Sequence, residues 1–352
     1  MRSWFPRFAL LTLILVAAAV PAAAQQGGGG ASLFITPSAR ADGMGRAFVS
    51  IADDPSALWF NPAGLGFIEH TEAMTNYAKL VPGLADDVFH MYLAYLKNSH
   101  SWGTFGGSVT YLSYGVSTIS RENPTGGADS VGTFSSYELA PMLSFGTAIS
   151  RNIAFGFSVK LLYVDLAPGY ALLQSGVATS NSVNGTGSSV AADIGVLARD
   201  TVHIGGRAVE LSIGSVLQNL GPSISFVDQA NSDPLPRNIN TGFSARVQLQ
   251  EGYAVTAAIN AQKFIIPTQG ATDSAGNVID VPSEPIHWHV GAEVLAAGTL
   301  AGRLGFIHDP GGQISSVTYG LGILLSKLQV DFASVPQAYS ERVKKFSLTV
   351  KF

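Results

Sequence analysis

The chain has 352 residues, and only 12% of them are charged, about half of the share of roughly 25% that is usual in soluble domains. Glycine, with 39 residues, fills much of this deficit, and such a composition argues against coiled coils and highly charged disordered chains. The formal net charge of -4 lacks the basic excess of a nucleic-acid-binding protein. The absence of cysteine excludes disulfides, thiolate metal sites and cysteine nucleophiles.

Residues 1–24 predict a cleaved secretory signal peptide. Arg2 and Arg7 supply a positive start, residues 8–20 an apolar core, and residues 22–24 a small-residue cleavage site. The core is short for a membrane span and no stop-transfer charges follow it, so a retained anchor is disfavoured. Because no other apolar run reaches 18 residues, we expect an exported protein without transmembrane helices.

Residues 25–69 predict a short helical segment. Four apolar residues have the i, i+3, i+4, i+7 spacing of an amphipathic helix: Met44, Ala47, Phe48 and Ile51. The dipeptide Asp54-Pro55 predicts a capped start for a second helix over residues 56–60, and Asn61-Pro62 repeats the same pattern.

From residue 70 to residue 352 the dominant period is two. Such alternation gives a strand one apolar face and one polar or small face. Fourteen segments show it, centred near Thr75, Leu93, Val109, Leu143, Val159, Ile194, Ile213, Ser244, Ala257, Val290, Leu304, Thr318, Val330 and Leu348. Short connections at 97–101, 150–152, 250–252, 297–298 and 326–327 mostly alternate with long ones at 115–136, 167–187, 221–236 and 265–283.

A soluble β-sandwich shows the same alternation, but an even strand number with tight turns on one side and long loops on the other is typical of an outer-membrane barrel. We therefore predict an all-β fold, a 14-stranded antiparallel transmembrane β-barrel over residues 70–352, with residues 25–69 as a hatch inside its lumen. Apolar residues at every second position of the chain end resemble the signal that the barrel assembly machinery recognises: Phe346, Leu348, Val350 and Phe352. Outer-membrane lipid and that machinery are the partners this fold implies.

The block from Ala39 to Leu65, ARADGMGRAFVSIADDPSALWFNPAGL, resembles the N-terminal block of the PorV/PorQ family, outer-membrane proteins related to the FadL-type long-chain fatty-acid channels. Its triplet Asn61-Pro62-Ala63 matches the NPA motif of the FadL hatch, and later segments at 214–222 and 235–238 are also similar. The resemblance covers essentially the whole mature chain and implies a fourteen-stranded barrel with an N-terminal hatch. The block departs from the family at Arg46, where a small residue is usual. We expect this cation to pair with a lumen carboxylate: Asp193, Glu293 or Asp331.

Inward-facing polar residues are the candidate lining of the lumen, and we interpret them as a network that holds the plug: His90, Asp193, Arg246, His287, His289, Glu293, Arg303 and Asp331. The two histidines near Val290 and Glu293 are metal-ligand types, but no tetrahedral spacing accompanies them, and we predict no metal and no cofactor. Because no G-x-S-x-G motif or ordered nucleophile and base is present, we predict that the chain is not an enzyme. Candidates for the aromatic girdles at the membrane interfaces are Tyr77, Tyr92, Tyr95, Tyr111, Trp288 and Tyr319.

The resemblance implies two functions. FadL relatives pass hydrophobic small molecules through the barrel wall or lumen. PorV relatives act in type IX secretion, where they receive cargo proteins and hand them to a surface-attachment complex. Our leading prediction is a FadL-like conduit for hydrophobic compounds in the bacterial outer membrane. A type IX secretion component and a structural or adhesive protein are the alternatives.

Overall fold

The computed structural model describes residues 30–123, 126–175, 184–226, 232–265, 285–337 and 341–352. The predicted signal peptide and almost all of the predicted connection at 265–283 lie outside the described residues. Within the described ranges, no helix combines the length and the apolar character needed to span a membrane.

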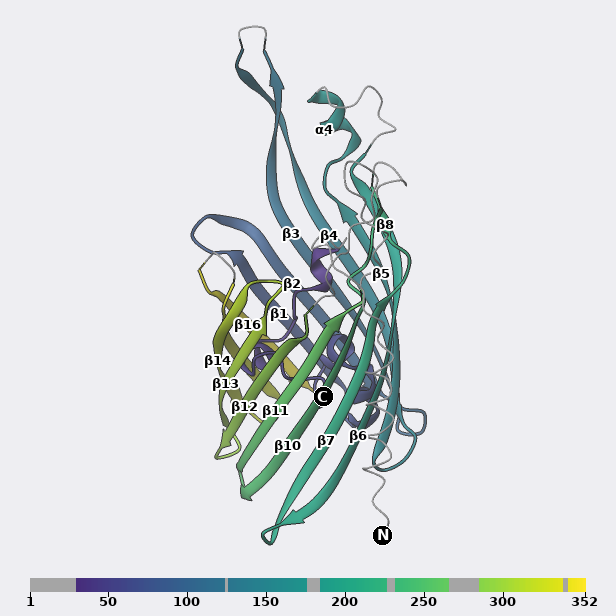
Figure 1. Cartoon of the computed structure of the whole chain (residues 1–352), viewed down its shortest axis with the longest axis vertical. Coiled ribbons are helices and arrows are strands. Elements are labelled where there is room, and N and C mark those ends of the chain that lie inside the picture. The colour runs from purple at the N-terminus through teal and green to yellow at the C-terminus, as the bar shows by residue number, and fades with distance from the viewer. Residues whose placement is uncertain (1–29, 124–125, 176–183, 227–231, 266–284, 338–340) are drawn as a thin grey trace.

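Antiparallel strands form a closed barrel in which β1 pairs with β16 (Figure 1). In the described part of the chain the barrel has fourteen strands: β1 (Glu72–Val81), β2 (Ala85–Asn98), β3 (Thr104–Glu122), β4 (Ala128–Ala148), β5 (Ile153–Asp165), β6 (Thr186–Ile204), β7 (Arg207–Leu220), β10 (Asn238–Gln250), β11 (Tyr253–Phe264), β12 (His287–Ala296), β13 (Leu300–Asp309), β14 (Ile314–Leu324), β15 (Leu328–Val335) and β16 (Val343–Lys351). All fourteen predicted centres lie within these strands, so the predicted strand number and fold class are confirmed.

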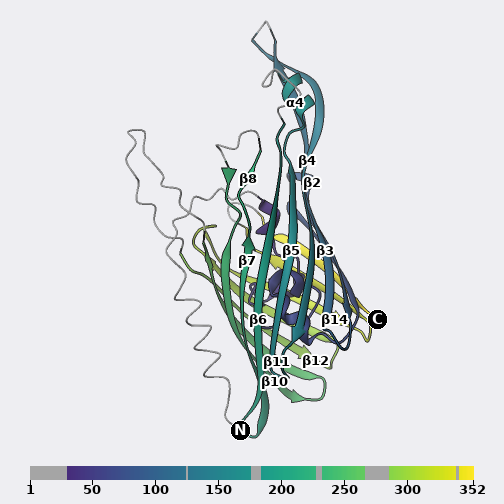
Figure 2. The ribbon, with the colours of Figure 1, turned by 90° about the vertical axis from the view of Figure 1, so that its right-hand side faces the viewer.

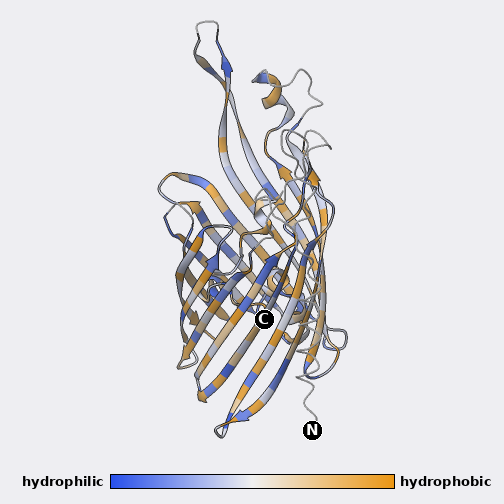
Figure 3. Ribbon diagram, in the orientation of Figure 1, coloured by the Kyte–Doolittle hydropathy of each residue, from blue (hydrophilic) through white to orange (hydrophobic). Residues whose placement is uncertain are grey.

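The period of two assigns each side chain to the outside or the inside. On β12, Trp288 is 43% exposed and the next residue, His289, is 3% exposed. On β16, Phe346 and Leu348 are exposed and Ser347 between them is buried. Apolar and polar residues interleave along the strands in the same way (Figure 3). One predicted girdle residue is wrong, because Tyr92 lies on the inward face of β2 and is fully buried.

The N-terminal segment, residues 30–71, lies between the walls of the barrel in two perpendicular views (Figures 1 and 2). Its short helices are η1 (Ala31–Leu33), α2 (Ala39–Gly43), α3 (Ala57–Phe60) and η2 (Pro62–Phe67). The helix α2 contacts β13 to β16, and η2 contacts β4 to β6 on the opposite side of the ring. The segment therefore packs against both sides of the wall.

The predicted amphipathic helix through Met44 and Ile51 is wrong. Gly45 and Arg46 have φ angles of 64° and 69°, in the left-handed region, so the chain turns where a helix was expected. Its apolar residues are nevertheless buried, and Met44 and Phe48 pack in one cluster with Phe60. The second predicted helix is present as α3, although its N-cap is Ser56.

The predicted long loop at 115–136 is also wrong, because β3 and β4 continue through most of it. Residues 116–122 pair with residues 128–135, beyond the last pairings of β3 with β2 and of β4 with β5. The segment contains β-branched residues such as Val116 and Ile119, which favour extended backbone. This outer hairpin rises well above the rest of the barrel (Figures 1 and 2). The connections at 167–187 and 221–236 contain α4 (Gly169–Gln174) and the ribbon of β8 (Ile224–Ser225) with β9 (Ser232–Asp233).

Candidate functional site

The NPA triplet fixes the N-terminal segment to the wall near the short-turn end of β4 to β6. The Asn61 side chain caps η2 by accepting a hydrogen bond from the Ala63 backbone N–H at 3.1 Å. Its amide nitrogen donates to the carbonyl oxygens of Val49 at 3.0 Å and Val196 at 3.2 Å. Asn61 therefore joins two parts of the segment to β6, and the predicted cap with proline at the first helical position is confirmed.

Inward-facing glycines let the segment approach the wall this closely. Gly156 on β5 pairs with Gly195 on β6 in the strand register. A Cβ at Gly156 would lie 2.2 Å from the Pro62 carbonyl carbon, and one at Gly195 would lie 2.1 Å from Asn61 Oδ1. On the opposite wall, Gly291 and Gly305 have the same relation to the backbone of Met44 and Gly45. Any larger residue at these positions would displace the segment.

A buried ion cluster ties the segment to the wall formed by β12, β13 and β15. Arg303 contacts Glu293 and Asp331, each at 2.7 Å. Arg40 of the segment contacts the same Glu293 at 3.1 Å and Asp53 at 2.6 Å. Burial opposes the charge on Arg40, but the surrounding carboxylates outweigh it and raise its pKa above the ordinary value. The predicted lumen residues Glu293, Arg303 and Asp331 thus lie together, whereas Arg40 was not predicted.

The predicted pairing of Arg46 with a lumen carboxylate is not what the structure shows. Arg46 pairs with Asp42 of its own segment at 3.4 Å. Of the three expected partners, Asp193 pairs with Lys160 at 2.8 Å, and the other two belong to the Arg303 cluster. Arg46 has a left-handed φ angle, a conformation that glycine adopts without steric cost, which explains why a small residue is favoured at this position.

The three predicted histidines have different surroundings. One ring nitrogen of His289 contacts the Gly45 carbonyl oxygen at 3.0 Å, and His287 contacts Asp309 at 3.2 Å. His90 is fully buried on β2, and its ring nitrogens have no hydrogen-bond partner among the described residues. In the same ranges, no group of three or more histidines and carboxylates has a metal-binding arrangement.

Toward the long-loop end, the lumen beside the segment is apolar. Leu33 of η1 packs in a buried cluster with Leu162 and Val164 of β5, Ala140 of β4 and Ile224 of β8. We call this set, together with Ala191 and Leu235, the upper apolar cluster.

Glu138 on β4 holds η1 against the upper apolar cluster. Its buried carboxylate accepts the backbone N–H groups of Ala31 at 3.0 Å and Ser32 at 2.8 Å. It also accepts a hydrogen bond from the Tyr114 hydroxyl.

The wall is interrupted where it borders the upper apolar cluster. In the β4–β5 ladder, Leu139 pairs with Tyr163 and Met142 with Lys160, but the residues between these pairs are not bridged. The cause is Pro141, which has no amide hydrogen to donate to β5. Its other neighbour, Val109 on β3, remains paired with it.

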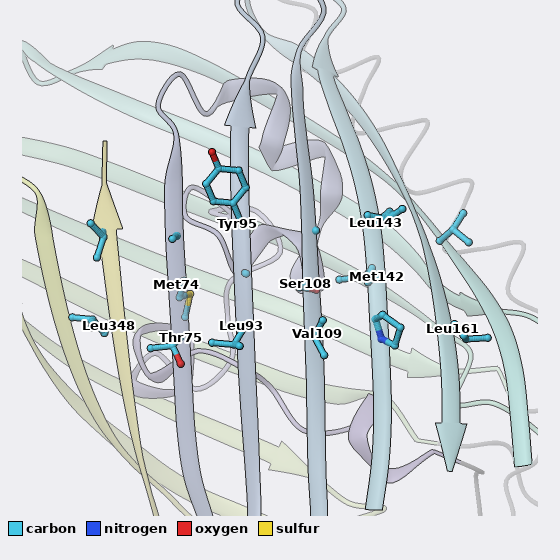
Figure 4. Close-up of a pocket in the computed structure, with 16 residues that line it drawn as sticks. Met74, Thr75, Leu93, Tyr95, Ser108, Val109, Met142, Leu143, Leu161 and Leu348 are labelled. Atoms are coloured by element: carbon cyan, nitrogen blue, oxygen red, sulfur yellow. The ribbon is translucent and has the colours of Figure 1, made fainter. Parts of the chain in front are cut away.

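An apolar groove of about 820 Å³ lies on the outer side of this interruption. It extends from β16 across β1 to β5, and its lining includes Leu93, Pro141, Leu143 and Leu161 (Figure 4). The interrupted ladder thus separates two apolar environments, the groove outside and the upper apolar cluster inside.

A row of aromatic rings crosses the outer face of the same five strands. The rings of Tyr77, Phe89, Tyr111, Tyr137 and Tyr163 follow one another at centroid distances of 5.7 to 6.1 Å. Such a row is typical of a membrane interface. We therefore expect the outer hairpin, which begins just beyond Tyr111 and Tyr137, to lie outside the hydrocarbon layer.

At the short-turn end, a polar pocket of about 390 Å³ lies between the segment and β6, β7, β10 and β11. The predicted lumen residue Arg246 lines this pocket together with Arg40 of the ion cluster. At the chain end, the Phe352 backbone N–H donates to the Thr71 carbonyl oxygen at 2.9 Å. Its role in an assembly signal stays a prediction.

Sequence reasoning missed Arg40, the wall glycines and Pro141. The glycines and Pro141 had a visible signal, because each occupies a strand position where a larger residue or an N–H donor is normally preferred. Arg40 had no such signal, because its partners come from β12 and from a turn of the segment itself.

Comparisons with known proteins agree with this architecture. The family model described as type IX secretion system protein PorV matches residues 26–271, more than two thirds of the chain. The crystal structure of the Pseudomonas putida toluene transporter TodX is similar, with 14% sequence identity, a TM-score of 0.50, and coverage of 89% of this chain and 97% of that one. A Pseudomonas aeruginosa FadL homologue has 12% identity and a TM-score of 0.42, with coverage of 90% and 98%. No curated protein matches the sequence.

Proposed function

Because the chain belongs to the family of the type IX secretion system protein PorV and is a bacterial outer-membrane β-barrel, we propose that it acts in transport across that membrane, as a conduit for hydrophobic small molecules. The observation that carries this proposal is the interrupted ladder at Pro141, with apolar surface on both of its sides. The fold it shares with the toluene transporter is consistent with that role. The matching family is that of a secretion system protein and the similar structure is that of a transporter, in keeping with the prediction that the chain is not an enzyme.

In the proposed route, a hydrophobic molecule crosses the wall between Ala140 and Leu162. These two inward-facing residues would be register partners, and both belong to the upper apolar cluster. The ladder lacks the hydrogen bond of the missing Pro141 N–H at this point, so a local separation breaks fewer bonds here than in a continuous part of the wall. The molecule would then displace η1 from the cluster, because Leu33 occupies that space.

Uptake of a hydrophobic tracer into liposomes that contain the purified barrel tests the proposal. We expect saturable uptake that increases when residues 25–69 are deleted, because that deletion removes both η1 and the lower part of the segment. Empty liposomes measure passive partition. Absence of uptake above that background in both proteins would contradict conduction.

The outer hairpin and the family match favour a second candidate, a type IX secretion component that docks secreted proteins. Residues 116–122 and 128–135 form a paired ribbon outside the membrane region, braced by a hydrogen bond of 2.7 Å from Arg121 Nε to the Gln174 carbonyl oxygen on α4. If this candidate is right, secreted cargo with a C-terminal sorting domain co-purifies with the barrel, and deletion of the hairpin abolishes capture. Negative results in both tests would favour a structural or adhesive role.

A further inference from the structure

The polar pocket at the short-turn end contains charges that the ion cluster does not use. Its lining carries the cations Arg40, Arg199, Arg246 and Lys351, and the carboxylates Asp53, Glu69, Glu72 and Glu210, with His70 at the rim. Four of these charges form two ion pairs: Arg40 contacts Asp53 at 2.6 Å, and Lys351 contacts Glu72 at 3.4 Å. Among the described residues, Arg199 and Arg246 have no carboxylate within ion-pair distance.

Arg199 is held in place by an aromatic ring and not by a carboxylate. Its guanidinium lies 3.8 Å from the centre of the Phe67 ring of η2. Stacking on one face leaves the planar N–H edge available, and that edge fits the geometry of a carboxylate or phosphate. A guanidinium fixed in this way loses little conformational freedom when it binds an anion.

The strand register places hydroxyl groups between the two arginines. Arg199 pairs with Ser212, Ser212 pairs with Ser244, and Arg246 follows Ser244 by two residues on the same face. With strands about 4.8 Å apart and about 3.3 Å per residue, the two arginine Cα atoms are roughly 12 Å apart. Two arginine side chains can span this distance and approach one anion from opposite sides. The Ser212 hydroxyl then lies between the two guanidinium groups.

We propose that this pocket binds a small soluble oxyanion, a carboxylate or phosphate group, between Arg199 and Arg246. Glu210 is the opposing charge inside the pocket: it faces Arg246 across the β7–β10 register without an ion pair between them. The carboxylate weakens the binding of an anion, and its position suits a ligand that also carries a hydroxyl or ammonium group. The site lies at the opposite end of the lumen from the Pro141 interruption and does not depend on the proposed conduit.

Calorimetric titration of the mature barrel in nonionic detergent tests this proposal, with inorganic phosphate and succinate in separate arms. We expect saturable binding of at least one of them. Arg199→Gln and Arg246→Gln should each weaken it about ten-fold or more, because each removes a charge-assisted hydrogen bond. Glu210→Gln should strengthen binding by removing a like charge. Arg151→Gln, an exposed arginine in the 150–152 turn and outside the pocket, is the matched control.

Two outcomes would overturn the proposal. One is the absence of saturable heat with both anions. The other is equal weakening by Arg151→Gln and by the two pocket variants, since that result would indicate a general surface effect. Unchanged heat-modifiable gel mobility establishes that each variant is folded, and binding by only one anion identifies which oxyanion the site prefers.

Discussion

Two regions of the same barrel hold the N-terminal segment by different means. The wall of β12 to β15 holds it by charge, through the contact of Glu293 with Arg40, and Arg303 and Asp331 complete the cluster. The ladders between these strands are paired without a gap. The wall of β4 and β5, above the NPA contact, holds it by apolar packing around Leu33 and by the hydrogen bonds of η1 to Glu138, and its ladder is interrupted at Pro141.

The difference indicates which side of the barrel can release the N-terminal segment. A buried ion cluster is costly to break, because separation leaves charges without partners in a medium of low dielectric constant. Apolar packing has a smaller penalty, since a hydrophobic molecule can take the place of the side chain that leaves, and among the described residues no ion pair holds η1 there. Displacement of η1 costs the two backbone hydrogen bonds that Glu138 accepts. We therefore expect the charged wall to stay fixed while the apolar wall admits a ligand, and four substitutions sharpen this comparison.

Arg303→Met should have the largest effect on the charged wall. It leaves the carboxylates of Glu293 and Asp331 buried with one cation fewer, and we expect a loss of about 3–5 kcal/mol in the free energy of unfolding. Denaturant unfolding in lipid vesicles measures it. The exposed Arg151→Met should change stability little, and a similar small change for Arg303→Met would show that the cluster does not hold this wall.

Leu304→Arg places the same kind of cation one residue further along β13. Leu304 is 62% exposed on the outer face, so the new charge would face lipid, with an expected loss of about 2–4 kcal/mol near the membrane centre. The same unfolding experiment measures it. A neutral effect would contradict the assignment of inner and outer faces.

Gly156→Ala tests the lower part of the apolar wall, where η2 makes close contact. The new Cβ would collide with the Pro62 carbonyl group, and we expect a loss of about 1–3 kcal/mol. Gly302→Ala is the matched control, since a Cβ there meets nothing within 4 Å. Equal stability of the two variants would mean that the segment does not seat against Gly156.

Pro141→Ala should have the smallest effect on stability and a clear effect on transport. It restores an N–H donor to the ladder, which stabilises the fold, but it also raises the conformational entropy of the unfolded chain. The net change in the free energy of unfolding should therefore stay within about 1 kcal/mol. Tracer uptake should fall because the ladder can close. Uptake equal to that of the unaltered protein would place the route elsewhere.

Much of this architecture could be predicted from the sequence, because a strand in the wall separates two environments at every residue. The period of two located every barrel strand, and Asn61-Pro62 predicted the cap of η2. The helix expected at Met44 failed because burial of its apolar residues is achieved by a turn, with the positive φ angles of Gly45 and Arg46.

The contacts that decide the site depend on register, which the sequence alone leaves open. Glu293 and Arg303 are paired across β12 and β13, but the second cation on Glu293, Arg40, comes from a distant segment. Pro141 is visible in the sequence, yet only the closed barrel shows that its missing N–H faces β5 and the upper apolar cluster.

The central claim is that hydrophobic molecules cross the wall at the interruption, and a reversible cross-link tests it most directly. The chain has no cysteine, so Ala140→Cys with Leu162→Cys introduces one disulfide across β4 and β5. Ser144→Cys with Ser158→Cys, a paired position lower on the same strands, is the control. We predict that oxidation stops tracer uptake in the first variant alone and that a reductant restores it. Unchanged uptake by the first variant, with its disulfide completely formed, would contradict this route.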